Sequence, residues 1–241
     1  MSEDTAKKQN TATSPEKPGS KGGLIHDAVI LFIITVIAAL ALGFVYELTK
    51  DPIAQAQAQA KADAFKAVFP SMESIKELDD IDGILDRANK LIEGEKAYEG
   101  VTIDDIVAVE GNFGLPLGWV MTVTSSKGYG GKITMTMGIS NGNNEDSSNA
   151  EKGMLMGLEF LSISETPGLG MNAKEDAFKS QFRGANVKQF SLAKRNISGD
   201  TEIDAISSAT ITTTAVTRSV NAALKVAWDL FLNSWNAENG N

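Results

Sequence analysis

The sequence predicts an α+β protein with one N-terminal membrane-spanning helix and a single domain in which helices flank a mixed or antiparallel sheet. Three observations predict this fold class. An apolar run without a charged residue covers residues 28–46. Stretches rich in β-branched residues, separated by glycine and asparagine turns, occupy the middle of the chain. A long amphipathic helical pattern then closes it, with apolar residues at steps of three and four.

The apolar run is predicted to span a membrane. A helix over residues 28–46 is about 28 Å long at about 1.5 Å per residue, close to a hydrocarbon core of about 30 Å. A cleaved signal peptide is the alternative, because Ala39-Leu40-Ala41 resembles a cleavage site. The run exceeds the usual apolar length of about 7–15 residues in signal peptides, which favours an uncleaved anchor. We therefore assign residues 24–48 to a transmembrane helix.

The residues before the span indicate its orientation. Residues 1–23 are rich in Pro, Gly, Ser and Lys and have almost nothing to bury, so a disordered tail is predicted. This tail carries Lys7, Lys8, Lys17 and Lys21, and the excess of positive charge predicts that it is cytoplasmic. The protein is then a single-pass protein of the cell membrane, in contact with lipid, with an extracytoplasmic C-terminal domain.

The remaining elements follow in order. Residues 49–70 are rich in Ala and Gln and predict a connecting helix that Pro70 ends. Residues 71–241 form the domain, whose size suits a single core. Its expected elements are a helix at 81–92, strands at 106–109, 119–124, 133–137 and 155–163, a helix at 174–182, and a last helix with Val216, Val220, Ala223, Ala227 and Phe231 on its apolar face.

Composition excludes several kinds of chemistry. The chain of 241 residues contains no cysteine, which excludes iron–sulfur clusters, thiolate nucleophiles and disulfides. Its one histidine, His26, lies beside the apolar run and outside the domain, so the domain has no Ser-His-Asp triad and no histidine zinc site. No calcium-loop pattern is present, and no metal site is predicted. A redox role therefore needs an organic cofactor.

The net charge excludes one class of partner. The formal charge is −9 at pH 7, and basic residues are not clustered as they are in nucleic-acid-binding proteins. We interpret the charge as a solvated acidic surface and expect no nucleic-acid partner.

Two glycine-rich segments lie between or after predicted strands. Residues 128–131 read Gly-Tyr-Gly-Gly and by themselves fit a hairpin turn. Residues 165–170 read Glu-Thr-Pro-Gly-Leu-Gly, in which Pro-Gly fits a type II turn. By itself, Glu165 fits an exposed carboxylate in that turn.

A third segment opens the last helix. Residues 204–212 read Asp-Ala-Ile-Ser-Ser-Ala-Thr-Ile-Thr. Ser207 is the predicted N-cap, which places Thr210 in the first turn. The first N–H groups of a helix lack partners and its dipole is positive there, so a phosphate on Thr210 is favoured. By itself the segment fits equally well a helix start that is rich in Ser and Thr.

Residues 204–212 resemble the D-x-x-[ST]-[GS]-A-[TS]-x-[ST] signature of RnfG and NqrC subunits of membrane redox pumps, in which FMN is attached through its phosphate to a threonine. The three segments occur in the order seen in RnfG-like proteins, after an N-terminal anchor, so the resemblance covers nearly the whole chain from the span onward. Three segments in order are much more specific than any one of them. Many relatives have glycine where this chain has Ser208.

The resemblance implies a covalent FMN on Thr210, attached by a flavin transferase that recognises the signature. It also implies that the loop at 165–170 lies beside the flavin ring and that the loop at 128–131 helps to shape the pocket. No catalytic residue and no metal ligand is implied. The implied cofactor-binding residues are Thr210, Asp204, Ser207, Ser208, Ala209, Thr212, Glu165, Thr166, Gly168, Leu169, Gly170, Gly128, Tyr129, Gly130 and Gly131.

The function implied by the resemblance is electron relay within a membrane ferredoxin:NAD oxidoreductase complex coupled to Na⁺ or H⁺ translocation. Such a chain needs other membrane and peripheral subunits and has no catalytic centre apart from its flavin. A close alternative is an NqrC-like subunit of a Na⁺-translocating quinone reductase, and another is a membrane-tethered, non-catalytic interaction domain. The S-x-x-K pattern at 191–194 raises the further alternative of a hydrolase or transpeptidase. This indication is weak, because no S-D-N or K-T-G follows the pattern.

Overall fold

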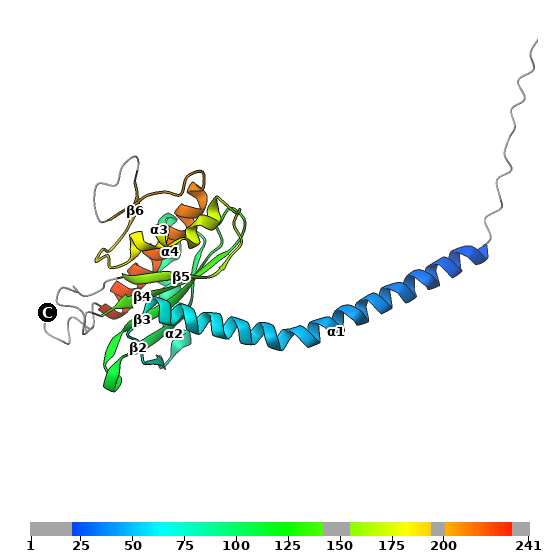
Figure 1. The fold of residues 1–241 in the computed structure, drawn as a ribbon, viewed down its shortest axis with the longest axis horizontal. Coiled ribbons are helices and arrows are strands. Elements are labelled where there is room, and N and C mark those ends of the chain that lie inside the picture. Colours follow the sequence, from blue (N-terminus) through cyan, green and yellow to red (C-terminus); the bar gives the residue numbers. More distant parts are fainter. Residues whose placement is uncertain (1–20, 142–154, 194–200, 233–241) are drawn as a thin grey trace, which may run out of the picture. The chain divides into compact units, whose positions relative to one another are not determined.

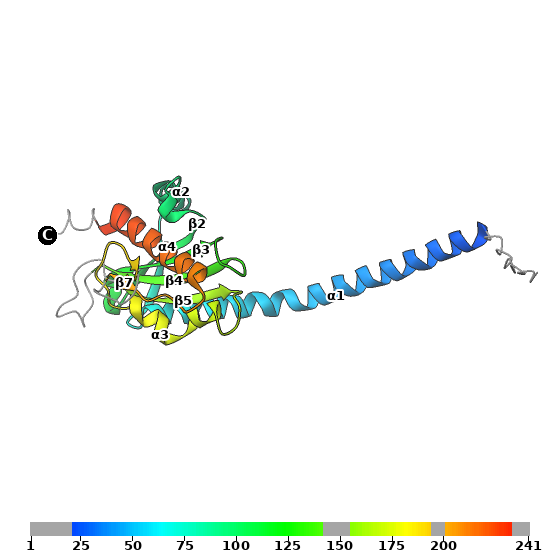
Figure 2. The same cartoon turned by 90° about the horizontal axis from the view of Figure 1, so that it is seen from above.

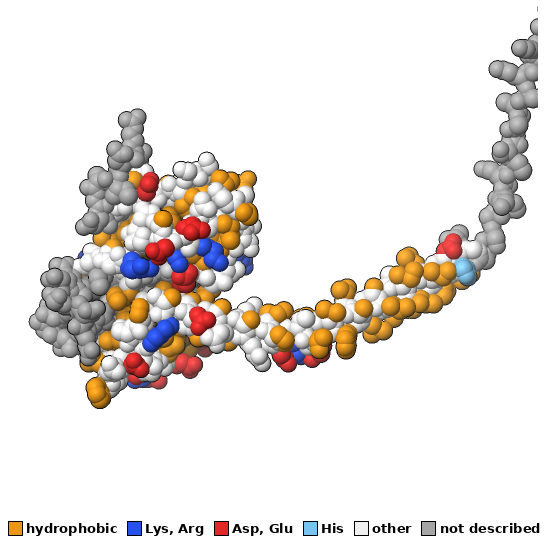
Figure 3. Space-filling view, viewed as in Figure 1, with side chains coloured by type: hydrophobic (Ala, Val, Ile, Leu, Met, Phe, Trp, Pro, Cys, Tyr) orange, Lys and Arg blue, Asp and Glu red, His pale blue; other side chains and the backbone are white. Residues whose placement is uncertain are grey.

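The computed structural model describes residues 21–141, 155–193 and 201–232. The chain divides into two units, residues 1–55 and residues 56–241. The described part of the first unit is the beginning of helix α1 (Lys21–Val68) (Figure 1). Among the described residues, α1 is the one helix long and apolar enough to cross a membrane. Apolar side chains predominate on its exposed surface from Ile25 to Leu48 (Figure 3). Most of the predicted tail lies outside the described residues.

The second unit is built on a five-stranded sheet. Its strands are β1 (Ser74–Glu77), β2 (Val101–Glu110), β3 (Pro116–Ser125), β4 (Ile133–Ser140) and β5 (Leu155–Ile163). They lie side by side in sequence order, and every neighbouring pair is antiparallel. Four of these strands lie at predicted positions. Strand β1 was not predicted, because all four residues of this edge strand are exposed and carry no apolar alternation.

Helices cover the two faces of the sheet. Helix α4 (Thr210–Ala227) packs across β2, β3 and β4, where Val216 and Val220 join a core with Met121 and Met135 (Figure 2). On the other face, the end of α1 places Phe65, Val68, Phe69 and Met72 against Val107, Val109, Leu117 and Val120. Both faces of the central strands are therefore buried, and the α+β class is confirmed.

The remaining helices agree with the sequence in part. Helix α2 (Ile81–Ile92) has its predicted bounds. The predicted helix at 174–182 is confirmed only in part, because α3 (Asp176–Lys179) is the only α-helical piece, between the 3₁₀ turns η3 (Gly170–Lys174) and η4 (Ser180–Phe182). Edge-to-face contacts of Phe182 with Phe178 and Phe190 hold this segment in short turns. The unit has further short elements that were not predicted: the 3₁₀ turns η1 (Lys96–Tyr98) and η2 (Asn112–Gly114), and the parallel two-residue strands β6 (Ser191–Leu192) and β7 (Glu202–Ile203). A π-helical turn, η5 (Trp228–Leu232), extends α4.

Side-chain amides connect segments that are far apart in the sequence. The Asn89 amide on α2 donates to the Ile103 carbonyl at 3.0 Å and accepts from its N–H at 2.9 Å. The Asn221 amide on α4 holds the backbone of Phe190 in the same way, at 2.9 and 2.7 Å. Such paired bonds replace a sheet ladder where a single strand segment meets a helix.

Candidate functional site

The loop between β3 and β4 lies close to the end of β5. A Cβ atom added at Gly130 would lie 2.1 Å from the carbonyl oxygen of Ser164, and one at Gly128 would lie 2.3 Å from the carbonyl oxygen of Gly131. Real Cβ atoms do not approach oxygen so closely, so glycine is required at both positions. The predicted hairpin loop is therefore also a contact surface for the segment after β5.

Glu165 lies in that contact. Its side chain is 7% exposed, and its Oε2 accepts a hydrogen bond of 3.2 Å from the backbone N–H of Gly130. Its Oε1 is buried and has no hydrogen-bond partner among the described residues. Burying a carboxylate oxygen without a partner is costly, and buried polar atoms normally have one. The interpretation of Glu165 as an exposed carboxylate in the turn is therefore wrong.

The turn after Glu165 has the geometry that Pro-Gly predicts. The backbone N–H of Leu169 donates to the Thr166 carbonyl at 3.1 Å, and Gly168 at the third position has φ 75°, as in a type II turn. The turn brings Gly170 against the start of α4. A Cβ at Gly170 would lie 2.6 Å from Oγ1 of Thr212 and 2.7 Å from Oε2 of Glu165.

The start of α4 differs from the prediction. The N-cap is Ala209, not Ser207, and no side chain caps the helix. The reason is that Thr213 closes the preceding turn: its Oγ1 accepts from the N–H of Ile206 at 3.1 Å and donates to the Ala209 carbonyl at 3.0 Å. Helix α4 therefore begins at Thr210 and leaves its first N–H groups without intrahelical partners.

Ser208 lies in that turn in a left-handed conformation, with φ 60°. Glycine adopts this conformation at no steric cost, whereas a side chain is disfavoured there. The backbone thus gives a physical reason for glycine at this place in the signature.

The threonines of α4 divide by environment. The hydroxyls of Thr213, Thr214 and Thr217 each donate to the carbonyl four residues earlier, at 3.0, 2.7 and 2.9 Å. Thr212 is buried beside Gly170. Thr210 is exposed at the first helical position. Of these five threonines, it is the one whose side chain is both accessible and placed at the helix N-terminus.

Three exposed apolar side chains come from the segments that meet at this junction: Tyr129, Leu169 and Ile211. Each is the chain neighbour of a residue in the contacts above, namely Gly130, Gly170 and Thr212. Ile211 was not among the predicted site residues. The sequence does contain a feature that identifies it, because Ile211 is a large apolar residue that lies off the helix face formed by Val216 and Val220.

The first residue of the signature is held by a more distant side chain. The Oε1 of Gln181 accepts from the N–H of Asp204 at 2.7 Å, and its Nε2 donates to the carbonyl of Asp204 at 3.4 Å. Gln181 was not a predicted site residue, since nothing near it in the sequence marks it. A hollow of about 480 Å³ lies beside this contact, and Phe178, Gln181, Asp204 and Ile206 are among the residues that line it.

The predicted site residues thus fall into two neighbouring groups. Residues 128–131, 165–170 and the start of α4 meet around Glu165. No hydrogen bond within the described ranges joins Asp204 or Ser207 to either glycine loop. Both residues are exposed, and Asp204 lies beside Gln181 of η4 and Phe178 of α3.

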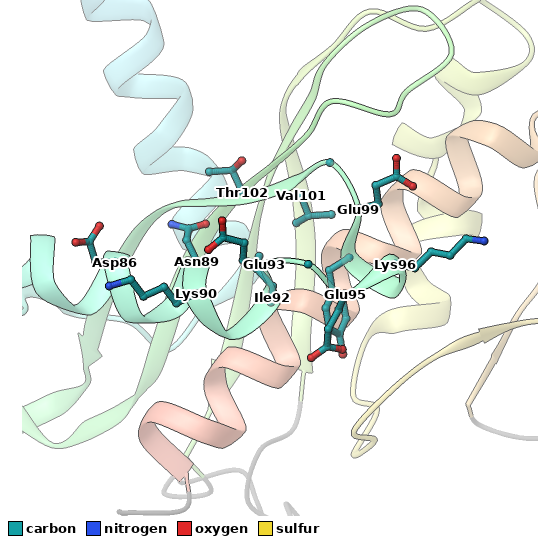
Figure 4. Close-up of a pocket in the computed structure, with 13 residues that line it drawn as sticks. Asp86, Asn89, Lys90, Ile92, Glu93, Glu95, Lys96, Glu99, Val101 and Thr102 are labelled. Atoms are coloured by element: carbon teal, nitrogen blue, oxygen red, sulfur yellow. The ribbon is translucent and has the colours of Figure 1, made fainter.

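A second hollow, of about 780 Å³, contains none of the predicted site residues. It lies between α2, η1 and the start of β2, and its charged side chains have both signs (Figure 4). At its rim, Glu99 forms an ion pair of 2.6 Å with Lys127, and the hydrogen bond from Lys127 lowers the pKa of Glu99. This pair ties the start of β2 to the residue that precedes the loop at 128–131.

Comparisons with known proteins match two parts of the chain. Residues 128–225 match the FMN-binding domain family, and residues 24–68 match the RnfG N-terminal region family. The matched domain begins at the first glycine of the β3–β4 loop and includes the whole signature at 204–212.

Similar proteins extend along most of the chain. The G subunit of the Na⁺-translocating ferredoxin:NAD⁺ oxidoreductase complex of Acetobacterium woodii is 26% identical over 211 residues, covering 84% of this chain and 90% of that protein. The G subunit of the proton-translocating ferredoxin:NAD⁺ oxidoreductase complex of Clostridium ljungdahlii is 29% identical over 195 residues, covering 81% and 86%. The crystal structure of Shewanella oneidensis NqrC aligns with a TM-score of 0.43 at 20% identity, over 55% of this chain and 60% of that one, less than two thirds of either.

Proposed function

This chain belongs to the RnfG family of proteins with an FMN-binding domain, and on that premise we propose that it relays electrons on FMN joined to Thr210 by a phosphoester. The relay operates within a membrane ferredoxin:NAD oxidoreductase complex. The match of residues 24–68 to the RnfG N-terminal region favours this family over the NqrC-like alternative. The observation that carries the proposal is the exposed side chain of Thr210 at an uncapped helix N-terminus, two residues before Thr212, which meets the buried junction of Glu165 and Gly170.

The start of α4 fits a phosphate ester. The helix has 18 residues and no side-chain cap, so its first N–H groups and the positive end of its dipole are available to an anion. An ester oxygen on Thr210 would lie at that end. The phosphate would then take the place of the missing cap, which explains why Ala209 is tolerated as the N-cap residue.

The junction around Glu165 fits a flavin ring. A flavin is a planar, largely apolar group with an N–H donor, and it needs apolar contacts and an acceptor. The side chains of Tyr129, Leu169 and Ile211 offer exposed apolar surface, and Oε1 of Glu165 is a buried acceptor without a partner among the described residues. We assign the cofactor contacts to these four residues and to the loops at 128–131 and 165–170.

When bound, FMN supplies one- and two-electron transfer, which the side chains of this domain do not provide. Glu165 accepts a hydrogen bond and, as a negative charge in a largely buried position, disfavours further negative charge beside it. Gly128, Gly130 and Gly170 allow the two loops and α4 to approach one another. Asp204, Ser207, Ser208, Ala209 and Thr212 complete the segment that a flavin transferase recognises.

The partners follow from the family. We propose the domain at residues 71–241 as extracytoplasmic and the N-terminal tail as cytoplasmic, with other membrane and peripheral subunits of the complex as partners. Na⁺ or H⁺ translocation belongs to those subunits. The span itself has no acidic or basic residue between Asp27 and Glu47 that could carry an ion.

The test uses the full-length chain produced together with a flavin transferase. After denaturing electrophoresis the chain should fluoresce under ultraviolet light, and mass spectrometry should locate one FMN on the peptide that contains Thr210. Thr210→Ala should lose both signals. Thr214→Ala is the matched control, because it removes a hydroxyl one helical turn later that is bonded to the Thr210 carbonyl, and it should keep them. Flavin that stays attached in Thr210→Ala would overturn the assignment.

A further inference from the structure

The loop between β2 and β3 projects one aromatic side chain into solvent. Phe113 is 108% exposed and lies in a left-handed conformation, with φ 61° and ψ 23°. A bulky residue is rarely found there, because the conformation is strained. Leu115, two residues later, is also exposed. The fold therefore accepts both backbone strain and exposed apolar surface at one point.

This loop is held by backbone hydrogen bonds. The N–H of Gly111 donates to the Leu115 carbonyl at 2.8 Å, and the N–H groups of Gly114 and Leu115 donate to the carbonyls of Gly111 and Asn112 at 3.2 and 3.3 Å. The Asn141 amide donates to the Pro116 carbonyl at 2.9 Å. Phe113 is thus presented by a preformed loop, and preorganisation lowers the entropy lost when such a side chain is bound.

The charges around the loop indicate what it binds. Residues 110–118 contain no Lys or Arg, and Glu110 stands at their start. Glu73 lies beside it, because its N–H donates to the Glu110 carbonyl at 3.0 Å. The ammonium group of Lys66 reaches this region too, where it donates to the Met72 carbonyl. Apolar residues that insert into bilayers are normally accompanied by basic residues that attract anionic lipid. Acidic neighbours disfavour that surface and complement a protein pocket with a basic rim.

The loop is also remote from the proposed flavin site. It precedes β3, whereas the loop at 128–131 follows β3, and β3 runs from Pro116 to Ser125 (Figure 1). A strand of this length separates its ends by roughly 30 Å at about 3.3 Å per residue. A protein bound at Phe113 would leave Thr210 and Glu165 uncovered.

We propose that Phe113 and Leu115 form a docking knob that inserts into an apolar pocket, rimmed by Lys or Arg, on another protein subunit of the same complex. The knob holds the domain in the assembly while the opposite end of the sheet stays available for electron exchange. The proposal rests on the family assignment of this chain as a complex subunit and does not depend on the flavin.

Photo-crosslinking in the native complex tests the identity of the occupant. Phe113 is replaced by p-benzoylphenylalanine, the complex is irradiated, and the products are identified by mass spectrometry. The expected result is a crosslink to one defined subunit, with basic residues near the crosslinked peptide. The same replacement at Arg87, exposed on α2, is the control and should not label that peptide. No crosslink, or a crosslink to lipid or to a second copy of this chain, would overturn the proposal.

A pair of substitutions separates docking from folding. Phe113→Gly relieves the left-handed strain while removing the side chain, so the thermal midpoint of the chain should be unchanged or higher. Retention of the chain in the purified complex should nevertheless fall about tenfold or more, as for a buried aromatic anchor. Phe113→Trp should largely restore retention. Flavin fluorescence from Thr210 should be the same in all three proteins, which distinguishes failure of the knob from failure of the electron-relay proposal. Full retention of Phe113→Gly would overturn the knob.

Discussion

The backbone N–H of Gly130 donates a hydrogen bond of 3.2 Å to Oε2 of Glu165, a residue 35 positions later. This bond joins the β3–β4 loop to the segment after β5 and draws the carboxylate into a largely buried position. The other oxygen of the same carboxylate stays without a partner among the described residues. The redox potential and the stability of the proposed flavin site should depend on this arrangement.

Replacing Glu165 by Gln should raise the midpoint potential of the bound flavin. The amide oxygen can still accept from Gly130, so the loop contact remains, but the buried negative charge is gone and reduction becomes easier. Redox titration of the flavinylated chain measures the shift. Glu165→Ala should in addition lower the free energy of unfolding by about 1–3 kcal/mol, because the N–H of Gly130 loses its acceptor. A potential that is equal in wild type and Glu165→Gln would place the carboxylate away from the ring.

Adding a methyl group at Gly130 or Gly170 should destabilise the domain by about 1–3 kcal/mol. The new Cβ would lie 2.1 Å from the Ser164 carbonyl oxygen in the first variant and 2.6 Å from Oγ1 of Thr212 in the second. Gly157→Ala on β5 is the control, since its Cβ would have no neighbour closer than 3.9 Å. Thermal denaturation of the full-length chain in detergent gives the unfolding midpoints of the three variants for comparison. Equal midpoints for Gly157→Ala and Gly130→Ala would contradict the close approach of the loop.

Substitutions at Ser208 should follow its backbone conformation. Ser208→Gly removes left-handed strain of about 1 kcal/mol but adds flexibility to the unfolded chain that costs about 0.5–1 kcal/mol, so stability should change little and flavin attachment should continue. Ser208→Val should slow attachment strongly, because a β-branched residue resists a φ of 60°. The attachment rate of both variants is measured as the fluorescence gained per minute during incubation with transferase and FAD. Equal rates for the Gly and Val variants would show that the turn rearranges freely.

Loss of the Gln181 contact should slow flavin attachment without unfolding the domain. Gln181→Leu removes both bonds to the backbone of Asp204, whereas Gln181→Glu keeps the acceptor for the N–H at 2.7 Å and loses the weaker donor at 3.4 Å. The expected order of attachment rates is wild type, then Glu, then Leu, with thermal midpoints within a few degrees. A drop in midpoint that parallels the drop in rate would indicate a purely structural role.

The ion pair between Glu99 and Lys127 should make the free energy of unfolding depend slightly on pH in the acidic range. The hydrogen bond from Lys127 lowers the pKa of Glu99 in the folded protein. The ion pair therefore contributes to stability at pH values above the pKa that Glu99 has in the unfolded chain. This contribution is lost as the pH falls through the pKa that Glu99 has in the folded protein. Lys127→Met should return the Glu99 pKa toward its ordinary value, as measured by NMR titration of the side-chain carboxyl. High salt should have a similar effect in the wild type, because the pair is exposed. An unchanged titration in Lys127→Met would exclude the ion pair in solution.

Much of the secondary structure could be predicted from local pattern. Helix α2 has its expected bounds, because its apolar residues recur at helical spacing, and β5 covers the predicted residues 155–163, because they form a short, mostly apolar run. The segments that were predicted incorrectly have no such local pattern, or are shaped by distant contacts. The exposed edge strand β1 has no pattern to detect, and the segment around Phe178 and Phe182 adopts short turns to serve aromatic contacts with Phe190.

The chain by itself determined the apolar span, the alternation of the central strands, the Pro-Gly turn and the order of three short segments, because each depends on residues adjacent in sequence. Only the tertiary structure decided that Glu165 is buried against Gly130, that Gln181 holds Asp204, and that α4 begins at Thr210. These outcomes depend on hydrogen bonds and close approaches between segments brought together by the packed sheet. Local periodicity does not record such partners, because it reports which face of an element is buried and not what that face meets.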